Sequence, residues 1–467
     1  MIYIKFLYIK FISNIKKILL LFIFFPFFNN LNGQELPTTK SYYVVDSYCC
    51  GGEESDPHAV FGIESPDGYV LLGKSLDNSF TENGFAVKIS KDLPDKKLFL
   101  HPEEEETFDW SFVDGEEGMR EGFNSAAIFN EHIFIAGYKE TKKNIIDRYL
   151  LKVRLSDGQL VWSTTFPSKS NKKSSAFESI ILTNENGILL TGVTNSSYDE
   201  LEGFKSYGNP TSGNAFSMYL STDALVSDVP PLNPNWEKQY KNSLTGKSIK
   251  NIDGSDDFLI SSSTHEPVVA KVLKIDKDGN LIWDKKYPNH GEITDIVSFQ
   301  NSFYLSGHKG SHKAGIDGSI TKISTDGKKI WNKSYGNPKE VNHIFFDEAL
   351  VEDNLIFDEC WSITNILNEG IIMACGTGIE ECEDLPENTQ AKCEEDPRTT
   401  WRSYLVKIDS SGEIIWEKTG SFTFPGEEDT DDLPSTASEW IFITQEGNIA
   451  SIIDLAFGIG LEIIETN

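Results

Sequence analysis

The stretch KIDKDGNLIWDKKY, residues 274–287, occurs in nearly the same form twice more, as KISTDGKKIWNKSY from Lys322 and as KIDSSGEIIWEKTG from Lys407. Each copy places an apolar–Lys–apolar run before a polar turn that contains glycine, and a tryptophan follows four residues after that glycine. A phrase repeated at constant internal spacing indicates that several segments solve the same packing problem. We therefore interpret the chain as a repeat protein.

A second phrase alternates with the first, and it is a short apolar run that ends in a small residue. Its seven copies are GYVLLG to Gly73, HIFIAG to Gly137, GILLTG to Gly192, DFLISS to Ser262, SFYLSG to Gly307, GIIMACG to Gly376 and a looser GNIASIID near Ile452. Each unit contains four short β-type runs separated by turns, and helical periodicity is not sustained. Units of roughly 45–75 residues, each a four-stranded antiparallel meander, predict an all-β, seven-bladed β-propeller.

The propeller is predicted to be a single domain over residues 34–467. Its last unit supplies only three strands, so the run at about 40–48 is expected to join the last blade as its outer strand and close the ring, which removes an exposed sheet edge. The seven blades are expected at about 58–113, 122–166, 175–240, 246–287, 291–335, 359–419 and 438–467.

Six tryptophans occupy the docking position of the repeat, and their expected role is structural. Trp283 and Tyr287 are four residues apart in an outer strand, so both project to one face. There they can pack on the neighbouring blade, with the stem of Lys285 between them. The docking positions are Trp110, Trp162, Trp236, Trp283, Trp331 and Trp416.

The Gly-x-x-x-Trp phrase resembles the tryptophan-docking motif of the quinoprotein-like, PQQ-repeat-like propeller superfamily, over most of the chain. It lacks the Gly-His and Trp-Asp pairs of WD40 blades and the double glycine of kelch blades. Some quinoprotein dehydrogenases carry a vicinal disulfide against the quinone and hold calcium with acidic and amide side chains. Cys49–Cys50 matches the first feature, but no residue matches the catalytic or calcium positions, and those enzymes usually have eight blades.

Residues 1–33 predict a signal peptide with cleavage near Gly33–Gln34. Its apolar run, residues 18–28, follows a lysine-dotted stretch and is too short to span a bilayer. The expected location is secreted, cell-surface or periplasmic, and no membrane span is expected after cleavage. Cysteines of an exported chain predict disulfides, and the candidates are Cys49, Cys50, Cys360, Cys375, Cys382 and Cys393. Cys360 and Cys375 start and end neighbouring strands and are expected within bridging distance, whereas the other pairings stay open.

The charge balance argues against nucleic acid as a partner. The formal net charge is −30, and the predicted signal peptide carries four lysines and no acid, so the remainder is near −34. No basic stripe offsets this charge, and such a surface repels phosphate backbones.

Most long insertions belong to the face from which the second–third and fourth–first connections emerge, here called the long-loop face. They cover residues 195–215, 335–359, 377–402 and 420–438. The acidic runs at 380–397 and 426–434 are dense in the oxygen ligands that calcium prefers, although neither has the ligand order of a specific site. His308 and His312 are four apart in GHKGSHKAG, where the glycines favour a flexible loop, and no metal role is predicted for them.

No nucleophile elbow, phosphate loop or HExxH motif occurs in the sequence. We predict an exported, monomeric and non-catalytic propeller that presents a loop-rich acidic face to a protein, a glycan or a cation. No organic cofactor is predicted, and calcium is the metal for which ligands are at hand. The alternative is a quinone- and calcium-dependent periplasmic or secreted oxidoreductase. No catalytic or cofactor-binding residue is assigned.

Overall fold

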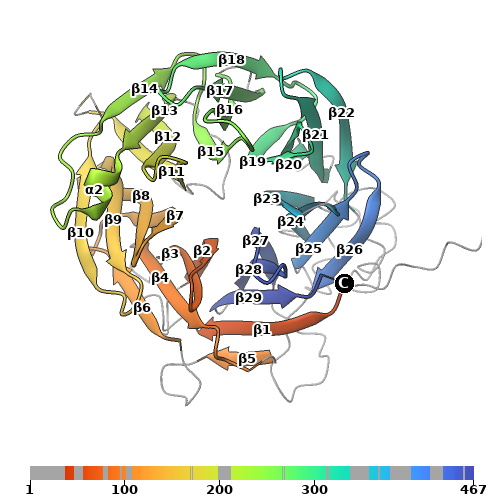
Figure 1. Cartoon of the computed structure of the whole chain (residues 1–467), viewed down its shortest axis with the longest axis horizontal. Helices are drawn as coiled ribbons and strands as arrows, with labels where there is room; N and C mark the ends of the chain where they lie inside the picture. Colours follow the sequence, from red (N-terminus) through yellow and green to blue (C-terminus); the bar gives the residue numbers. More distant parts are fainter. Residues whose placement is uncertain are drawn as a thin grey trace, which may run out of the picture. The chain divides into compact units, whose positions relative to one another are not determined.

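The strands of the computed structural model surround one axis as seven four-stranded antiparallel blades, counted over the residues that the structure describes (Figure 1). In blades 1 to 6 the first strand in the sequence lies nearest the axis and the last forms the outer rim, whereas in blade 7 the outer strand comes from the beginning of the chain. A single β-bridge, between Ile316 and Phe357, joins the sheets of blades 5 and 6, whose described strands otherwise form no backbone pairing with each other. The predicted seven-bladed β-propeller is confirmed.

The described residues are 37–46, 56–76, 82–94, 97–100, 108–168, 170, 172–197, 212–265, 267, 269–311, 315–336, 357–366, 369–378, 401–420, 435–455 and 458–466. The predicted signal peptide and four candidate disulfide cysteines, Cys49, Cys50, Cys382 and Cys393, lie outside them. Residues from Pro37 onward form one compact unit. Within these ranges no helix has the length and apolar character that crossing a membrane requires.

Blades 1 to 4 lie between Asp56 and Lys286. Their strands are β2 (Asp56–Glu64), β3 (Gly68–Leu76), β4 (Glu82–Ser90) and β6 (Trp110–Asp114); β7 (Glu121–Phe129), β8 (His132–Lys142), β9 (Ile145–Arg154) and β10 (Leu160–Phe166); β11 (Ser174–Leu182), β12 (Ile188–Ser196), β13 (Asn214–Leu220) and β14 (Trp236–Tyr240); and β15 (Gly246–Asn251), β16 (Phe258–Ser263), β17 (Ala270–Ile275) and β18 (Leu281–Lys286). A short helix, α2 (Thr222–Val226), precedes β14.

Blades 5 to 7 use the rest of the chain and one strand from its beginning. Their strands are β19 (Glu292–Phe299), β20 (Ser302–Ser311), β21 (Gly315–Ser324) and β22 (Lys329–Tyr335); β23 (Phe357–Ile366), β24 (Gly370–Gly378), β25 (Arg402–Ile408) and β26 (Ile414–Gly420); and β27 (Thr436–Ile443), β28 (Ile449–Leu455), β29 (Gly458–Ile464) and β1 (Thr39–Asp46).

The ring is closed as the sequence predicts, because β1 pairs antiparallel with β29, with Tyr43 opposite Leu461. One strand was not anticipated. β5 (Lys97–Leu100) lies in the long connection between β4 and β6 and pairs in parallel with β1. It covers the outer edge of the closing strand, which would otherwise present unpaired backbone groups.

The apolar core consists of seven layers, one between each pair of neighbouring blades. Between blades 3 and 4, for example, Leu189 packs with Ile249 and Ile260, and all three are fully buried. Both faces of every blade are therefore apolar. This explains why the second strands read as continuous apolar runs rather than as alternating ones.

The tryptophan of one blade rests on the glycine turn of the next. Gly279 has φ of 75°, and a Cβ there would lie 2.5 Å from the ring of Trp236. Tyr240, four residues after that tryptophan, donates its hydroxyl proton to the Gly279 carbonyl at 3.0 Å. The next two junctions repeat the bond, from Tyr287 to Gly327 and from Tyr335 to Gly412, each at 2.9 Å.

The other tryptophans dock with some variation. Trp110 rests on Gly158, the turn glycine of the next blade, where a Cβ would lie 2.8 Å from its ring, and its indole N–H donates to the Leu155 carbonyl at 2.9 Å. Trp162 donates to the Ser227 carbonyl at 3.1 Å, and Ser227 directly follows α2, which enlarges the turn of blade 3. Trp416 is buried in the layer between blades 6 and 7. The docking position is thus used at every one of these junctions, but the partner follows the length of the neighbouring turn.

Two glycine-to-alanine variants measure how much this docking contributes to the stability of the fold. Gly279→Ala should lower the free energy of unfolding by about 1–3 kcal/mol more than Gly254→Ala, because the new methyl group collides with Trp236. Gly254 is the matched control, since its φ is 71° and nothing lies within 4 Å of a Cβ there. Urea denaturation of both variants measures the difference, and equal losses would contradict a docking role for Trp236.

Candidate functional site

Each of the seven described inner strands contains one extra residue at an equivalent position, seen as a shift in its pairing with the second strand. We call this set the bulge ring, and its members are Val60, Asn124, Glu178, Lys247, Thr294, Trp361 and Glu439. Inner strands begin at the long-loop face, so the ring surrounds the axis near that face. Bulges re-aim side chains, and they are frequent beside functional sites.

The small residue that ends each second strand makes room for the bulge. A Cβ on Gly73 would lie 1.8 Å from the carbonyl oxygen of His58, two residues before the bulge at Val60. Gly137, Gly192 and Gly307 approach the inner strand equally closely. The repeated apolar phrase with its terminal small residue is thus the sequence counterpart of the bulge ring.

The bulge ring encloses a narrow axial cavity. Five of its members, Val60, Lys247, Thr294, Trp361 and Glu439, line the cavity. Its volume is about 20 Å³, which is room for about one water molecule. The channel is therefore nearly closed at this level, and the chemistry of the site lies in the groups around the constriction.

Lys247 is the only cation of the bulge ring, and it lies among carboxylates. Its ammonium group forms an ion pair with Glu292. It also interacts electrostatically with Glu178 and Glu359. Burial, which leaves this lysine only 5% exposed, lowers its pKa to about 8. With Glu439 on the cavity wall, four carboxylates surround one ammonium group in the interior of the ring.

His308 does not supply a second positive charge at neutral pH. The sequence placed it in a flexible loop, and this expectation is wrong: it lies within β20, whose pairing with β21 continues to Ser311. Its Nε2 is 3.9 Å from Glu292 Oε2, and burial lowers the pKa of His308 to about 4. The imidazole is therefore neutral at pH 7. His312, its partner in the sequence motif, lies outside the described residues.

A belt of polar side chains, one residue after the bulge in blades 2 to 6, ties neighbouring inner strands together, whereas Phe61 and Trp440 occupy that position in blades 1 and 7. Asp295 is fully buried, accepts a hydrogen bond from Ser248 Oγ at 2.6 Å and another from Ser362 Oγ at 3.2 Å. Lys250 balances its charge at 3.1 Å. On the other side of the ring, Ser125 and Ser179 accept backbone N–H bonds from the next blade at 3.3 Å. These bonds hold the bulge ring at fixed geometry.

A disulfide lies next to the bulge ring in blade 6. Cys360 and Cys375 are bonded and fully buried, and they occupy opposing positions on β23 and β24. The Cys360 carbonyl accepts a hydrogen bond from Thr294, a ring residue of blade 5, at 2.9 Å. In this blade Cys375, rather than the neighbouring Gly376, occupies the small-residue position.

Sequence reasoning placed the candidate site on the long-loop face but missed the residues that form it. Lys247, Glu178 and Glu292 carry no motif of their own. A signal was nevertheless present, because the bulge residue is followed in several blades by Ser-Ile or Asp-Ile, at 179–180, 248–249, 295–296 and 362–363. The four long insertions fall largely outside the described residues. Within the described part of the chain, no group of three or more His, Cys, Asp or Glu side chains is arranged to hold a metal ion.

A second buried histidine makes the stability of the fold depend on pH. His290 is 1% exposed and its Nδ1 is 2.9 Å from the Thr321 hydroxyl. Burial lowers its pKa from 6.5 to about 3. Between these two values the unfolded chain binds more protons than the folded protein, so stability is lost as the pH falls.

We expect this residue alone to lower the free energy of unfolding by about 3 kcal/mol between pH 7 and pH 4. Urea denaturation of the wild type and of His290→Gln at both pH values tests the expectation. The variant should lose less stability on acidification, because the carboxylates that titrate in the same range are common to both proteins. Parallel losses would show that His290 is protonated in the folded state.

Comparisons with known proteins extend to the fold alone. No family model and no curated protein matches the chain. Similar solved structures include hydrazine synthase of Kuenenia stuttgartiensis, with 6% identity and a TM-score of 0.45 over 90% of this chain and 94% of that chain. BamB from Moraxella catarrhalis has 9% identity and a TM-score of 0.38, over 88% of this chain and 100% of that chain.

Quinohemoprotein alcohol dehydrogenase from Comamonas testosteroni has 8% identity and a TM-score of 0.46, over 92% of this chain and 77% of that chain. At these identities the three proteins assign no activity to this chain. What the chain itself displays is a seven-bladed propeller architecture, with neighbouring blades docked through the Gly-x-x-x-Trp phrase.

Proposed function

We propose that the protein is an exported, non-catalytic binding scaffold that takes up a cationic group at the long-loop end of its axial channel. The group belongs to a protein, a glycan or a metal ion. The observation that supports this function is the cluster of carboxylates at the bulge ring, where Glu178, Glu292 and Glu359 attract Lys247 and Glu439 lines the same cavity. His308 is neutral there at pH 7 and adds no positive charge.

The position of these carboxylates strengthens their attraction for a cation. The ring lies in a protein interior rather than in bulk water, and a field between low-dielectric walls is focused along the opening. The acidic runs 380–397 and 426–434 stand in the sequence between β24 and β25 and between β26 and β27, and they lie outside the described residues. The hydrogen bonds of the belt below the ring hold neighbouring inner strands together against the mutual repulsion of the carboxylates around Lys247.

The quinone cofactor implied by the family resemblance does not fit the described channel. A tricyclic quinone needs far more space than a cavity of about 20 Å³, which takes a single water molecule. Cys49 and Cys50, the residues that matched the vicinal disulfide, lie outside the described residues. The proposal therefore includes no organic cofactor and no step of redox chemistry.

Native mass spectrometry of the mature protein, prepared with calcium and quinone available, separates the possibilities. We expect a polypeptide mass without an organic adduct, reduced by two hydrogens for each disulfide. A calcium adduct would identify the cation as a metal ion. An organic adduct that survives desalting would contradict the proposed function and support an oxidoreductase.

Binding of tetralysine tests the cationic specificity directly. Isothermal titration at low ionic strength should show binding that weakens as salt is added, because the attraction is screened. Glu439→Gln removes one carboxylate of the cavity wall and should raise the Kd about fivefold, as expected for about 1 kcal/mol.

Glu131→Gln provides the matched control, since Glu131 is exposed in the turn between β7 and β8 on the opposite face. It makes the same change in net charge and should leave the Kd unaltered. If both variants weaken binding equally, the peptide is attracted by the overall charge, and the proposed site is wrong.

A further inference from the structure

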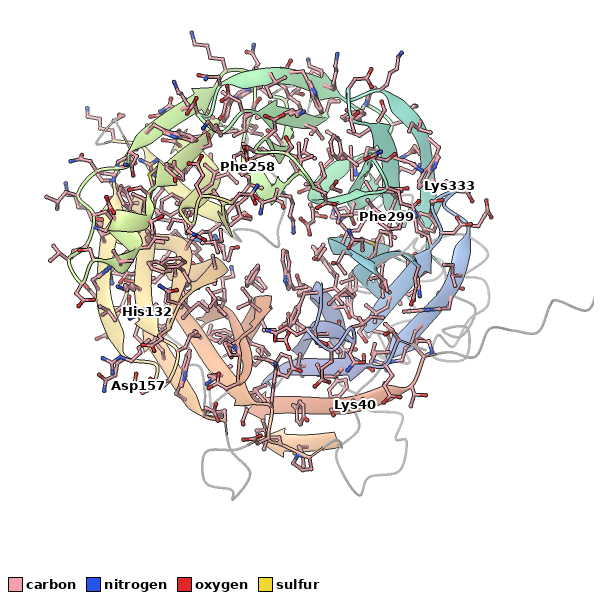
Figure 2. The ribbon with its side chains drawn as sticks, in the orientation of Figure 1. Lys40, His132, Asp157, Phe258, Phe299 and Lys333 are labelled. Atoms are coloured by element: carbon pink, nitrogen blue, oxygen red, sulfur yellow. A yellow bond between two sulfur atoms is a disulfide. The ribbon has the colours of Figure 1, made fainter. Side chains whose placement is uncertain are left out.

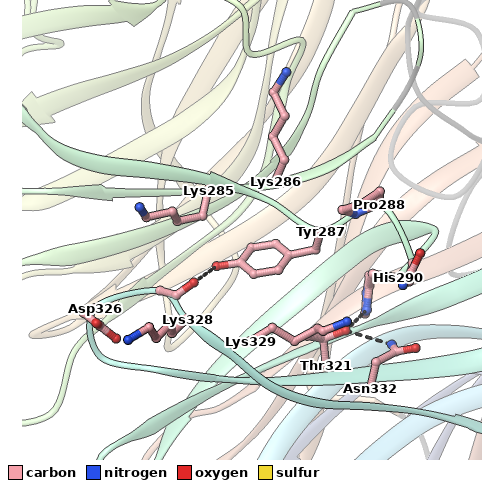
Figure 3. A pocket seen from close by; sticks show the side chains of 12 residues that line it. Lys285, Lys286, Tyr287, Pro288, His290, Thr321, Asp326, Lys328, Lys329 and Asn332 are labelled. Atoms are coloured by element: carbon pink, nitrogen blue, oxygen red, sulfur yellow. Dashed lines mark hydrogen bonds between the residues drawn. The ribbon is translucent and has the colours of Figure 1, made fainter.

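A groove at the outer rim between blades 4 and 5 is lined by four lysines, in a chain whose net charge is −30. The groove has a volume of about 380 Å³. In Figure 3 Tyr287 lies between Lys285 of blade 4 and Lys328 and Lys329 of blade 5, and Lys286 extends away from blade 5. Among the described residues none of the four lysines forms an ion pair.

The remaining charges of the groove offset only part of the charge of the lysines. Asp326 is the one carboxylate among the lining residues; it accepts a hydrogen bond from Ser324 and is attracted electrostatically by Lys328. Asp284, next to Lys285 in the sequence, is paired with the buried Lys271 at 2.6 Å. His290 lines the groove as a neutral imidazole because of its lowered pKa. A local excess of three positive charges remains.

Comparison with the next junction shows how blades 4 and 5 differ from blades 5 and 6. Lys333 of blade 5 occupies the position of Lys285 of blade 4, two residues after the docking tryptophan. It reaches the residue after the turn glycine of blade 6, Glu413, and forms an ion pair with it at 2.5 Å. Figure 2 shows Lys333 at the outer rim. The residue equivalent to Glu413 in blade 5 is Lys328.

The same fold therefore places opposite charges together at one junction and like charges at the other. The stem of Lys285 passes over Gly327, where a Cβ would lie 2.8 Å from its Cγ, so this lysine is held beside Lys328. Two like charges held together disfavour the folded state unless an anion lies between them. Lys329 adds a third, at a position where blades 4 and 6 have exposed Leu281 and Ile414.

We propose that the groove is a binding site for a small sugar that carries an oxyanion, such as a phosphate or sulfate ester or a carboxylate. Lysine ammonium groups bind such oxyanions as point charges. A volume of about 380 Å³ is far larger than an inorganic anion needs and falls in the range of small-molecule sites. The ligand therefore includes an organic part.

The floor of the groove carries groups that suit hydroxyls. Asn332 donates to Thr321 Oγ1 at 2.8 Å and to Ser319 Oγ at 3.2 Å, which orients its amide oxygen as an acceptor. The exposed amide of Asn289 lines the groove beside Pro288. A hydroxylated ligand is thus held by amide contacts on the floor, while its anionic group lies between Lys285, Lys328 and Lys329.

Isothermal titration at low ionic strength with glucose 6-phosphate, glucose 6-sulfate, glucuronate, glucose and inorganic phosphate tests the proposal. At least one of the three anionic sugars should bind, more tightly than inorganic phosphate, and glucose should not bind measurably. The three anions distinguish among the ester and carboxylate sources of the charge. Absence of binding by all three, or equal affinity for inorganic phosphate, would overturn the proposal.

Two variants copy residues that other blades already use, so they preserve the blade fold. Lys328→Glu recreates the Lys333–Glu413 arrangement and should weaken binding about tenfold or more, since it replaces a favourable charge contact with a repulsive one. Lys329→Leu should weaken it as well. Lys143→Glu, at an exposed lysine in the turn between β8 and β9, makes the same charge change far from the groove in sequence. An affinity that falls equally in this control, or in none of the variants, would overturn the assignment.

Discussion

The ring depends on one contact that is repeated from blade to blade, an aromatic pair of the outer strand resting on a left-handed glycine of its neighbour. Trp236 and Tyr240 make this contact on Gly279, and the Tyr240 hydroxyl bonds the glycine carbonyl. Because seven separate apolar layers make up the core, each blade is stabilised only by its two neighbours. The docking contact sets the distance and angle between blades, and hence the diameter of the channel that they enclose.

At that diameter the bulge ring leaves only a small cavity in the axial channel, and this limits where a ligand can bind. Lys247 and its surrounding carboxylates are fixed by the belt below them, in which Asp295 joins Ser248 and Ser362 across three blades. In the proposed function the channel attracts a cation. The proposed groove at the rim, by contrast, depends on the residues after one turn glycine. The two proposed sites therefore differ in origin, because one is formed by the whole ring and the other by a single junction.

The fold was predictable because its signals are local. A glycine with positive φ and a tryptophan four residues later can be recognised without knowing their partners, and so can the small residue that ends each second strand. The bulge ring was not predicted, because a bulge is defined by the pairing of two strands and Glu178 or Lys247 alone looks like any strand residue. β5 was missed for a similar reason, since its four residues acquire a role only beside β1. His308 was misplaced because glycines, which usually mark loops, here lie within β20.

The closing strand also has a consequence for biosynthesis. The hydroxyl of Thr39 in β1 bonds Glu462 in β29, two residues 423 positions apart in the chain. Synthesis therefore delivers β1 long before β29, and the seam cannot form until the positions between Thr39 and Glu462 have emerged. Until then β1 remains an apolar segment without its native neighbour, the kind of segment that aggregates or requires a chaperone. The order of delivery means that blade 7 is completed only once β29 is present, and a chain truncated before β29 would lose the seam that closes the ring.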